Sequence, residues 1–160
     1  MLIPHRYRGA RGRSPCRNTV SDMVTFDDVV AVIAELPDVA ETQRYGSRAW
    51  SVGNKTVAWE RPFSKADVRR FGDATPPDGP ILAVTVGDLG EKEAILAEHK
   101  RGVFTIPHFD GYAAVLLQLN VVSKRTARDL VIDAWLACVP KSRGEEFLAR
   151  ASRRPRSRRD

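Results

Sequence analysis

The segment from Gly102 to Val122 constrains the fold most, because it contains a strand-length run that is apolar on both sides. Read with period two, this run places apolar side chains on both faces: Ala113, Val115, Leu117 and Leu119 on one, Ala114 and Leu116 on the other. A strand of this kind lies in the middle of a sheet or beneath a covering layer. The compact turn before it, Pro107–Tyr112, carries the most chemically varied residues of the chain and is a candidate site.

Length and composition predict a single globular domain. The chain has 160 residues, of which 42% are hydrophobic and 29% charged, as in ordinary soluble proteins. No apolar run approaches the ~18 to 20 residues of a membrane span, and no apolar segment follows the N-terminal arginines as in a secretory signal. The two cysteines, Cys16 and Cys138, support neither a disulfide framework nor a zinc site, so we expect a cytoplasmic protein.

Positive charge is concentrated at the two ends of the chain. Residues 1–22 hold five arginines and one acid, residues 141–160 hold eight basic and three acidic residues, and the total is +6, so residues 23–140 carry −3. We expect a disordered basic leader over 1–22, an α+β domain over 23–142, and a basic tail over 143–160 that begins with a short helix and is then disordered. The net charge alone does not indicate a nucleic-acid-binding face on the domain.

Hydrophobic periodicity and capping signals predict short helices and strands. Helices are expected over 26–36, after Ser64 for one or two turns, over 89–100, from Ser123 to Pro140, and near 145–151. Strands are expected over 48–52, 55–60, 81–86, 103–106 and 113–119. Gly53-Asn54 predicts a tight hairpin, with Trp50 and Val52 on one face of its first strand and Val57 and Trp59 on one face of its second. Because hairpins dominate, we predict an α+β two-layer sandwich, with an antiparallel sheet of about five strands and helices packed on one face.

Several segments resemble motifs of the MmcQ/YjbR family. Residues 36–59 resemble its N-terminal half, with matches at Leu36, Pro37, Val39, Glu41, Tyr45, Gly46, Gly53 and Lys55. The segment FTIPHFDGYAAVLLQL resembles its Thr-x-Pro-His-[Tyr/Phe]-x-Gly-x-x-x-Val-Leu motif, with matches at Thr105, Pro107, His108, Phe109, Gly111, Val115 and Leu116. Asp133-Ala134-Trp135 and Val139-Pro140-Lys141 resemble its closing segments, so the likeness extends over about residues 23–142.

The resemblance implies a fold more clearly than an activity. It implies the frataxin-like (CyaY-like) two-layer sandwich, and a DNA-binding role through likeness to a double-wing arrangement. It implies no established reaction and no catalytic residues. Where many members have a small residue or proline after Tyr-Gly-x, this chain has Arg48, which adds a positive charge beside the first hairpin.

The Pro107–Tyr112 turn offers one candidate ligand site. His108 could act as a ligand or general base, Asp110 lies two residues away to orient it, and Tyr45 would line a pocket beside it. The alternative is that His108 hydrogen-bonds the turn backbone, while Pro107 and Gly111 fix the shape of the turn.

Basic residues offer a second candidate site, at the first hairpin. The group comprises Arg44, Arg48, Lys55 and Arg61, with Trp50 and Trp59 interleaved. Basic side chains neutralise phosphates and aromatic rings stack on bases, so the hairpin could serve as a DNA-binding wing. The alternative is a solvated strand face over buried tryptophans. Lys124 and Arg125, in the first turn of the last long helix, could hold a phosphate or lie in solvent near Asp129.

Catalytic and metal-binding patterns are missing from the sequence. There is no P-loop, GxGxxG, GxSxG or CxxC motif, and the remaining histidines, His5 and His99, lack metal-ligand spacing. The first helix has no run of acids of the kind that binds iron in frataxin-type proteins. We therefore expect no metal and no cofactor, and the sequence gives no basis for assigning an enzymatic activity.

Two functional hypotheses follow. The first is non-specific DNA binding through the basic hairpin, reinforced by the arginine-rich tail. The second is a non-catalytic module that binds a partner or small ligand at the Pro107–Tyr112 turn. A concave pocket beside His108, lined by Tyr45 or Trp59, would favour the second hypothesis.

Overall fold

The computed structural model describes residues 23–154, which form one antiparallel sheet and five α-helices. The six strands lie in the order β1-β2-β3-β4-β6-β5. Their bounds are β1 Ala40–Arg44, β2 Ser47–Val52, β3 Lys55–Glu60, β4 Ile81–Thr85, β5 Val103–Phe104 and β6 Ala114–Gln118. The predicted α+β class is confirmed, with six strands where about five were expected. The predicted leader, 1–22, and the end of the predicted tail, 155–160, lie outside the described residues.

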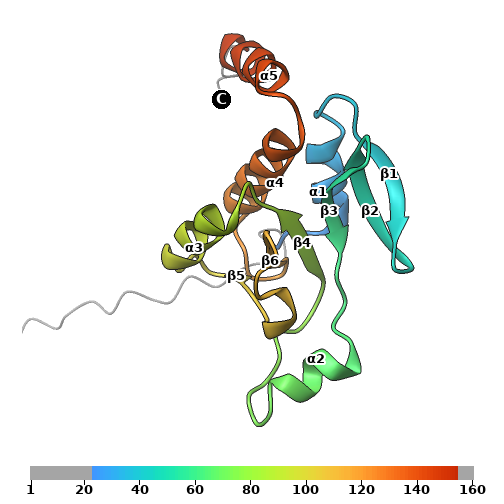
Figure 1. Ribbon diagram of the computed structural model, residues 1–160, viewed down its shortest axis with the longest axis vertical. Coiled ribbons are helices and arrows are strands. Elements are labelled where there is room, and N and C mark those ends of the chain that lie inside the picture. The colour runs from blue at the N-terminus through green and yellow to red at the C-terminus, as the bar shows by residue number, and fades with distance from the viewer. Residues whose placement is uncertain (1–22, 155–160) are drawn as a thin grey trace, which may run out of the picture.

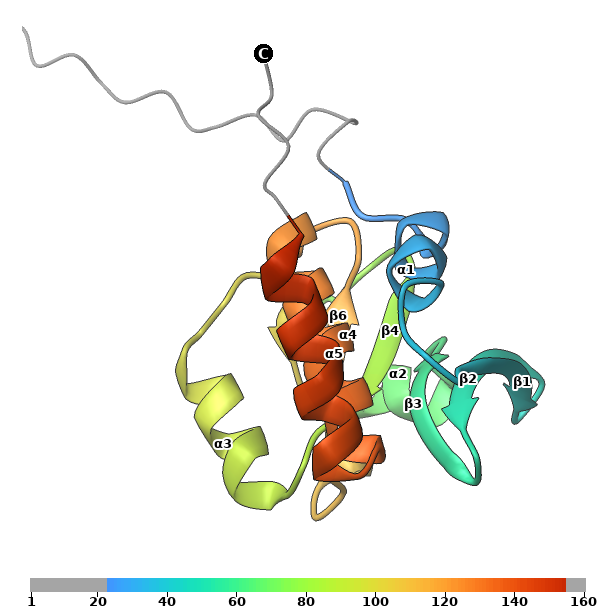
Figure 2. The ribbon, with the colours of Figure 1, turned by 90° about the horizontal axis from the view of Figure 1, so that it is seen from above.

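Helices α1 (Phe26–Ile33) and α4 (Lys124–Cys138) cover one face of the sheet and bury the larger apolar cluster against it (Figures 1 and 2). Thr25 begins α1 in a capping box with Asp28, and the helix ends at Ile33, three residues before the expected end. The predicted stripe of α4 is buried: Ala127, Leu130, Val131, Ala134, Trp135 and Cys138. These two helices form the helical layer of the sandwich.

The other helices lie around the edges of the sheet: α2 (Lys65–Arg70), α3 (Leu89–Ala97) and α5 (Lys141–Arg153). Figure 1 places α2 and α5 at opposite ends of the molecule, and α3 on the side opposite the β1–β2 hairpin. Helix α5 is longer than the short helix expected near 145–151, and its Phe147 ring lies 5.0 Å from that of Trp135. Within residues 23–154, no helix is long and apolar enough to cross a membrane.

Strand β6 is buried on both faces, as its sequence predicts. It pairs with β4 along five residues, from Thr85 opposite Ala114 to Ile81 opposite Gln118. Val115 and Leu117 face the helical layer, whereas Ala114 and Leu116 belong to a smaller cluster on the opposite face. Aromatic side chains cover that second face: Phe63, Phe71, Phe104 and Phe109. Only the two-residue strand β5 lies beyond β6, so the covering layers, rather than a central position, bury this strand.

A β-bulge in β3 changes which face its side chains occupy. Trp50 pairs with Ala58 and Ser51 pairs with Thr56, which leaves Val57 as the extra residue. Val57 therefore packs under the helices, and Trp59 packs in the cluster on the opposite face. The prediction that Val57 and Trp59 share a face is wrong, because period two fails at a bulge. The bulge directs Trp59 toward the second face, where the candidate site lies.

Candidate ligand-binding pocket

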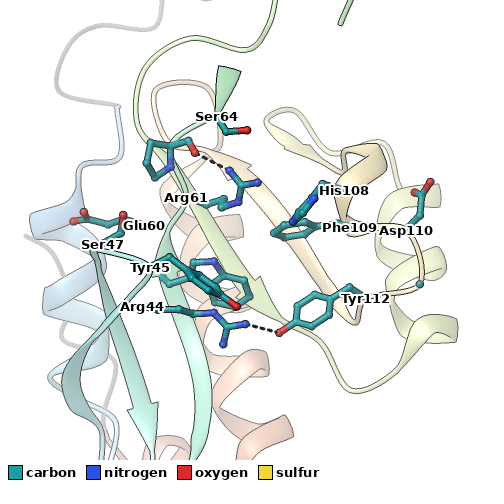
Figure 3. A pocket seen from close by; sticks show the side chains of 13 residues that line it. Arg44, Tyr45, Ser47, Glu60, Arg61, Ser64, His108, Phe109, Asp110 and Tyr112 are labelled. Carbon is teal, nitrogen blue, oxygen red and sulfur yellow. Dashed lines mark hydrogen bonds between the residues drawn. The ribbon is translucent and has the colours of Figure 1, made fainter. Parts of the chain in front are cut away.

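A pocket of about 800 Å³ lies on the second face, between two segments far apart in the sequence (Figure 3). One wall comes from the turn after β1 and from the end of β3 with the segment that follows it. The other wall is the Pro107–Tyr112 corner. The lining residues are Arg44, Tyr45, Ser47, Trp59, Glu60, Arg61, Pro62, Ser64, His108, Phe109, Asp110, Gly111 and Tyr112.

The first wall depends on a two-residue turn. Tyr45 and Gly46 connect β1 to β2 with positive φ angles of 50° and 76°, as a tight hairpin turn requires. Glycine tolerates this conformation, whereas tyrosine adopts it at a cost. The turn places the Tyr45 side chain in solvent, where it is 93% exposed, beside the pocket.

The second wall is held from below by a buried lysine. Pro107–Phe109 forms a single 3-10 turn, and Gly111 has a φ of 71°. The Lys92 ammonium of α3 donates hydrogen bonds to the carbonyl oxygens of Phe109, at 2.6 Å, and Tyr112, at 2.9 Å. Lys92 is only 6% exposed, and burial lowers its pKa, an effect that the negative charge of Asp110 partly offsets. Sequence reasoning missed this residue, because Lys92 lies between Glu91 and Glu93 in a helix without a strong apolar stripe.

Arg44 bridges the two walls. Its Nη1 donates to the Thr56 hydroxyl and its Nη2 to the Tyr112 hydroxyl, each at 3.2 Å. The guanidinium carbon lies 4.8 Å from the centre of the Trp59 ring and 5.3 Å from that of Tyr45. Among residues 23–154, no carboxylate forms an ion pair with Arg44, and its buried Nε has no hydrogen-bond partner.

Arg61, in contrast, is neutralised by a buried acid. Its Nη1 lies 2.9 Å from an oxygen of Asp67, which is 2% exposed. Burial raises the pKa of Asp67, but hydrogen bonds from the Ser64 backbone, from Arg61 and from the Ser64 hydroxyl together lower it below its ordinary value. The Arg61 guanidinium carbon also lies 5.6 Å from the centre of the Phe109 ring.

Aromatic rings form most of the apolar lining. The Tyr112 ring lies edge-on to Trp59, with 6.3 Å between centroids, and to Phe109, with 5.8 Å. Trp59 and Phe109 are 6.2 Å apart. Figure 3 shows Tyr45 on one side of the pocket, and Tyr112, Phe109 and His108 on the other. These separations are typical of packed aromatic pairs, so the lining is a continuous aromatic surface.

The structure brings together five residues that the sequence assigned to two different sites. Arg44 and Arg61 come from the basic hairpin group. Tyr45, His108 and Asp110 come from the candidate ligand site at the Pro107–Tyr112 turn. Figure 3 shows the Asp110 carboxylate directed away from the pocket and from His108, so the two side chains are not arranged as an acid–base pair. Within the described part of the chain, no group of three histidine, cysteine, aspartate or glutamate residues is placed to hold a metal ion.

The remaining basic candidates lie outside the pocket. Arg48 donates to both oxygens of Glu41, each at 3.2 Å, and its Nη1 lies 3.6 Å from Glu60. Lys55 is exposed in the β2–β3 hairpin. Lys124 lines a second hollow of about 420 Å³ beside Lys100 and Arg101. The other candidate at the start of α4, Arg125, is exposed and lies 3.9 Å from Asp129.

Comparisons with known proteins identify relatives by sequence. No family model matches the chain, and no solved structure matches it, so the resemblance to MmcQ/YjbR proteins stays a prediction. The chain is 42% identical over 130 residues to the uncharacterized protein Rv2570 of Mycobacterium tuberculosis (strain ATCC 25618 / H37Rv), covering 79% of this chain and 98% of the relative. The uncharacterized protein Mb2600 of Mycobacterium bovis matches with the same identity and coverage. The chain therefore belongs to the family of these uncharacterized mycobacterial proteins.

Proposed function

We propose that the protein is a non-catalytic module that binds a small anionic ligand in the pocket between the β1–β2 turn and the Pro107–Tyr112 corner. The observation that carries this proposal is the state of Arg44. Its guanidinium lines the pocket without a carboxylate partner among residues 23–154, and its buried Nε has no hydrogen-bond partner there. An anion in the pocket would supply the opposite charge that the Arg44 guanidinium lacks.

The other charged residues of the lining agree with an anionic ligand. Asp67 neutralises Arg61, and the Glu60 carboxylate lies 3.6 Å from Arg48 Nη1. Asp110 points away (Figure 3). Arg44 is thus a cation of the lining that forms no ion pair among residues 23–154. The volume of about 800 Å³ lies within the ~300 to 1,000 Å³ that is usual for small-molecule sites.

The proposal is tested by titrating small anions into the full chain and its variants, using isothermal calorimetry. Benzoate and phenyl phosphate serve as probes, and ring NMR shifts of Trp59 report where they bind. We expect Arg44→Gln to weaken binding about tenfold or more, because it removes a charge-assisted hydrogen bond. Arg44→Lys should restore part of the affinity, since it keeps the charge but not the bidentate geometry.

Arg150→Gln is the matched control, because Arg150 is exposed on α5, outside the pocket, and pairs with Glu146. It should leave the affinity unchanged. Equal affinities of the Arg44→Gln and Arg150→Gln variants, with both folded by circular dichroism, would contradict the anchoring role. If neither anion bound the wild-type chain at millimolar concentration, the proposal would fail altogether.

Nucleic-acid binding is kept as a second proposal, and one observation favours it. Lys100, Arg101 and Lys124 surround one hollow at the start of α4, together with Ser123 and Thr126. Several cations around one hollow suit a backbone phosphate. In the predicted wing, Arg48 and Arg61 are paired with acids. In the hollow, Lys100 is paired with Glu98, whereas Arg101 and Lys124 form no ion pair among residues 23–154.

Membership of the MmcQ/YjbR family is likewise a proposal. It is supported by the match at Pro107, His108 and Gly111, of which His108 and Gly111 line the pocket. A crystal structure superposed on solved members of that family would test it. A different strand order would contradict the proposal.

A further inference from the structure

We infer that the ligand of this pocket is flat and aromatic: an aromatic or heteroaromatic ring that carries one acidic group. The inference rests on the proposed function, in which Arg44 anchors the acidic group. It adds the chemistry of the rest of the ligand, and two features of the pocket lead to it.

The first feature is a pair of exposed aromatic rings at the rim. Tyr45 is 93% exposed and Tyr112 is 42% exposed, although large aromatic side chains are usually buried. Tyr45 also holds a φ of 50°, which costs free energy for any residue other than glycine. The two rings come from different walls and stand on opposite sides of the opening (Figure 3). A flat ligand ring inserted between the walls would contact both tyrosines.

The second feature is the alternation of cations and rings in the wall. The Arg44 guanidinium lies over Trp59 and over Tyr45, and Arg61 lies over Phe109. A planar guanidinium and an aromatic face both present flat surfaces on which a further π-system stacks. An aliphatic chain would fill the same volume without these stacking contacts.

The experiment compares probes that differ only in ring character. Benzoate is matched with cyclohexanecarboxylate, and phenyl phosphate with cyclohexyl phosphate, each titrated calorimetrically into the full chain. We expect each aromatic probe to bind about tenfold more tightly than its saturated match, within the range that stacking on one aromatic side chain provides. The carboxylate and phosphate pairs distinguish which acidic group the pocket prefers.

Two variants of Tyr45 test the contact with the ligand ring separately from the contact of Arg44 with the acidic group. Tyr45→Ala should reduce the preference for benzoate over cyclohexanecarboxylate to about twofold or less, because it removes one of the rings on which an aromatic probe stacks. Tyr45→Phe should keep the preference, because it keeps the ring. Both substitutions lie in an exposed turn and leave the core intact.

The outcomes distinguish the two levels of inference. If the wild-type chain bound the saturated and aromatic probes equally well, the ligand would not need to be aromatic, and this inference would be wrong. If Arg44→Gln also lost affinity for both probes, the proposed anion-binding pocket would still be supported. If the Tyr45→Ala variant still preferred aromatic probes, the Tyr45 ring would not be the contact that selects them. If no probe binds the wild-type chain, the proposed function fails and this inference fails with it.

Discussion

Lys92 is the residue on which the shape of the corner depends most. Its ammonium lies under the Pro107–Tyr112 segment and donates to two of its carbonyl oxygens. No carboxylate of the described residues pairs with it, so its charge is balanced by backbone dipoles and by the more distant Asp110. A buried cation in this position fixes where Phe109 and Tyr112 stand, and therefore the width of the pocket.

The substitution Lys92→Met should destabilise the protein by about 1 to 2 kcal/mol in urea denaturation, because lost charge-assisted hydrogen bonds outweigh the relief of burial. The exposed Lys65→Met is the control and should change the free energy of unfolding by less than about 0.5 kcal/mol. A Lys92→Met protein as stable as wild type would show that packing alone holds the corner.

The same residue predicts a pH dependence. Burial lowers the native pKa of Lys92 below the 10.5 of an ordinary lysine, so the unfolded chain binds more protons between these two values. Wild-type stability should therefore rise relative to Lys92→Met as the pH increases through that window. Paired denaturation curves measured at successive pH values test the sign, and a relative fall would contradict it.

Asp67 should contribute stability that is lost in acid. Its native pKa is below the ordinary 3.8, so the contribution is complete above that value and disappears as the pH falls through the native pKa. Asp67→Asn should cost about 3 kcal/mol at pH 7, because it leaves the Arg61 charge without its buried partner. The exposed Asp73→Asn should cost little. The difference between wild type and Asp67→Asn should shrink in strong acid, and a constant difference would refute the electrostatic origin.

At the scale of elements, the sequence predicted those segments whose side chains follow a regular period. Strand β3, strand β6 and helix α4 lie within a residue or two of their expected bounds. Strand β1 was missed, because its sequence AETQR is polar and almost wholly exposed, and only pairing with β2 makes it a strand. The bulge at Val57 was missed for a related reason: it is a property of the pairing between two strands, not of either sequence alone.

The loop that connects α3 to β5 depends on Gly102. Its φ is 79°, and a Cβ added there would lie 2.6 Å from the backbone nitrogen of Val122. Gly72 is the matched control, because its φ is 57° and nothing lies within 4 Å of an added Cβ. Both Gly→Ala substitutions incur a backbone penalty of about 1 to 2 kcal/mol, but only Gly102→Ala adds a steric clash with backbone. Thermal unfolding should show a clearly larger loss for Gly102→Ala, and equal losses would exclude the close approach as the cause.

At the scale of the whole molecule, the pocket exists because the sheet brings the β1–β2 turn beside a corner some sixty residues later in the chain. Individual lining residues were recognisable from the sequence: His108 and Tyr45 in one hypothesis, Arg44 and Arg61 in another. Their convergence was not, because it follows from strand order and from the bulge that turns Trp59 toward the second face. The ion pairs of Arg48 and Arg61 could not be predicted from the sequence either, because tertiary contacts decide which acids lie beside them.

The distribution of charge over the whole chain gives the last prediction. Residues 23–140 carry −3, whereas residues 1–22 carry +4 and residues 141–160 carry +5. Any nucleic-acid binding should therefore depend on the hollow lined by Lys100 and Lys124 and on the two basic ends, not on the pocket. In fluorescence anisotropy with a short DNA duplex, Lys100→Gln/Lys124→Gln should reduce the slope of log affinity against log salt by up to about 1.8, or ~0.9 for each lost phosphate contact. Arg44→Gln should leave the slope unchanged, because Arg44 lies in the pocket. An unchanged slope in the double variant would exclude the hollow, and no binding by the full chain at low salt would exclude nucleic acid as the partner.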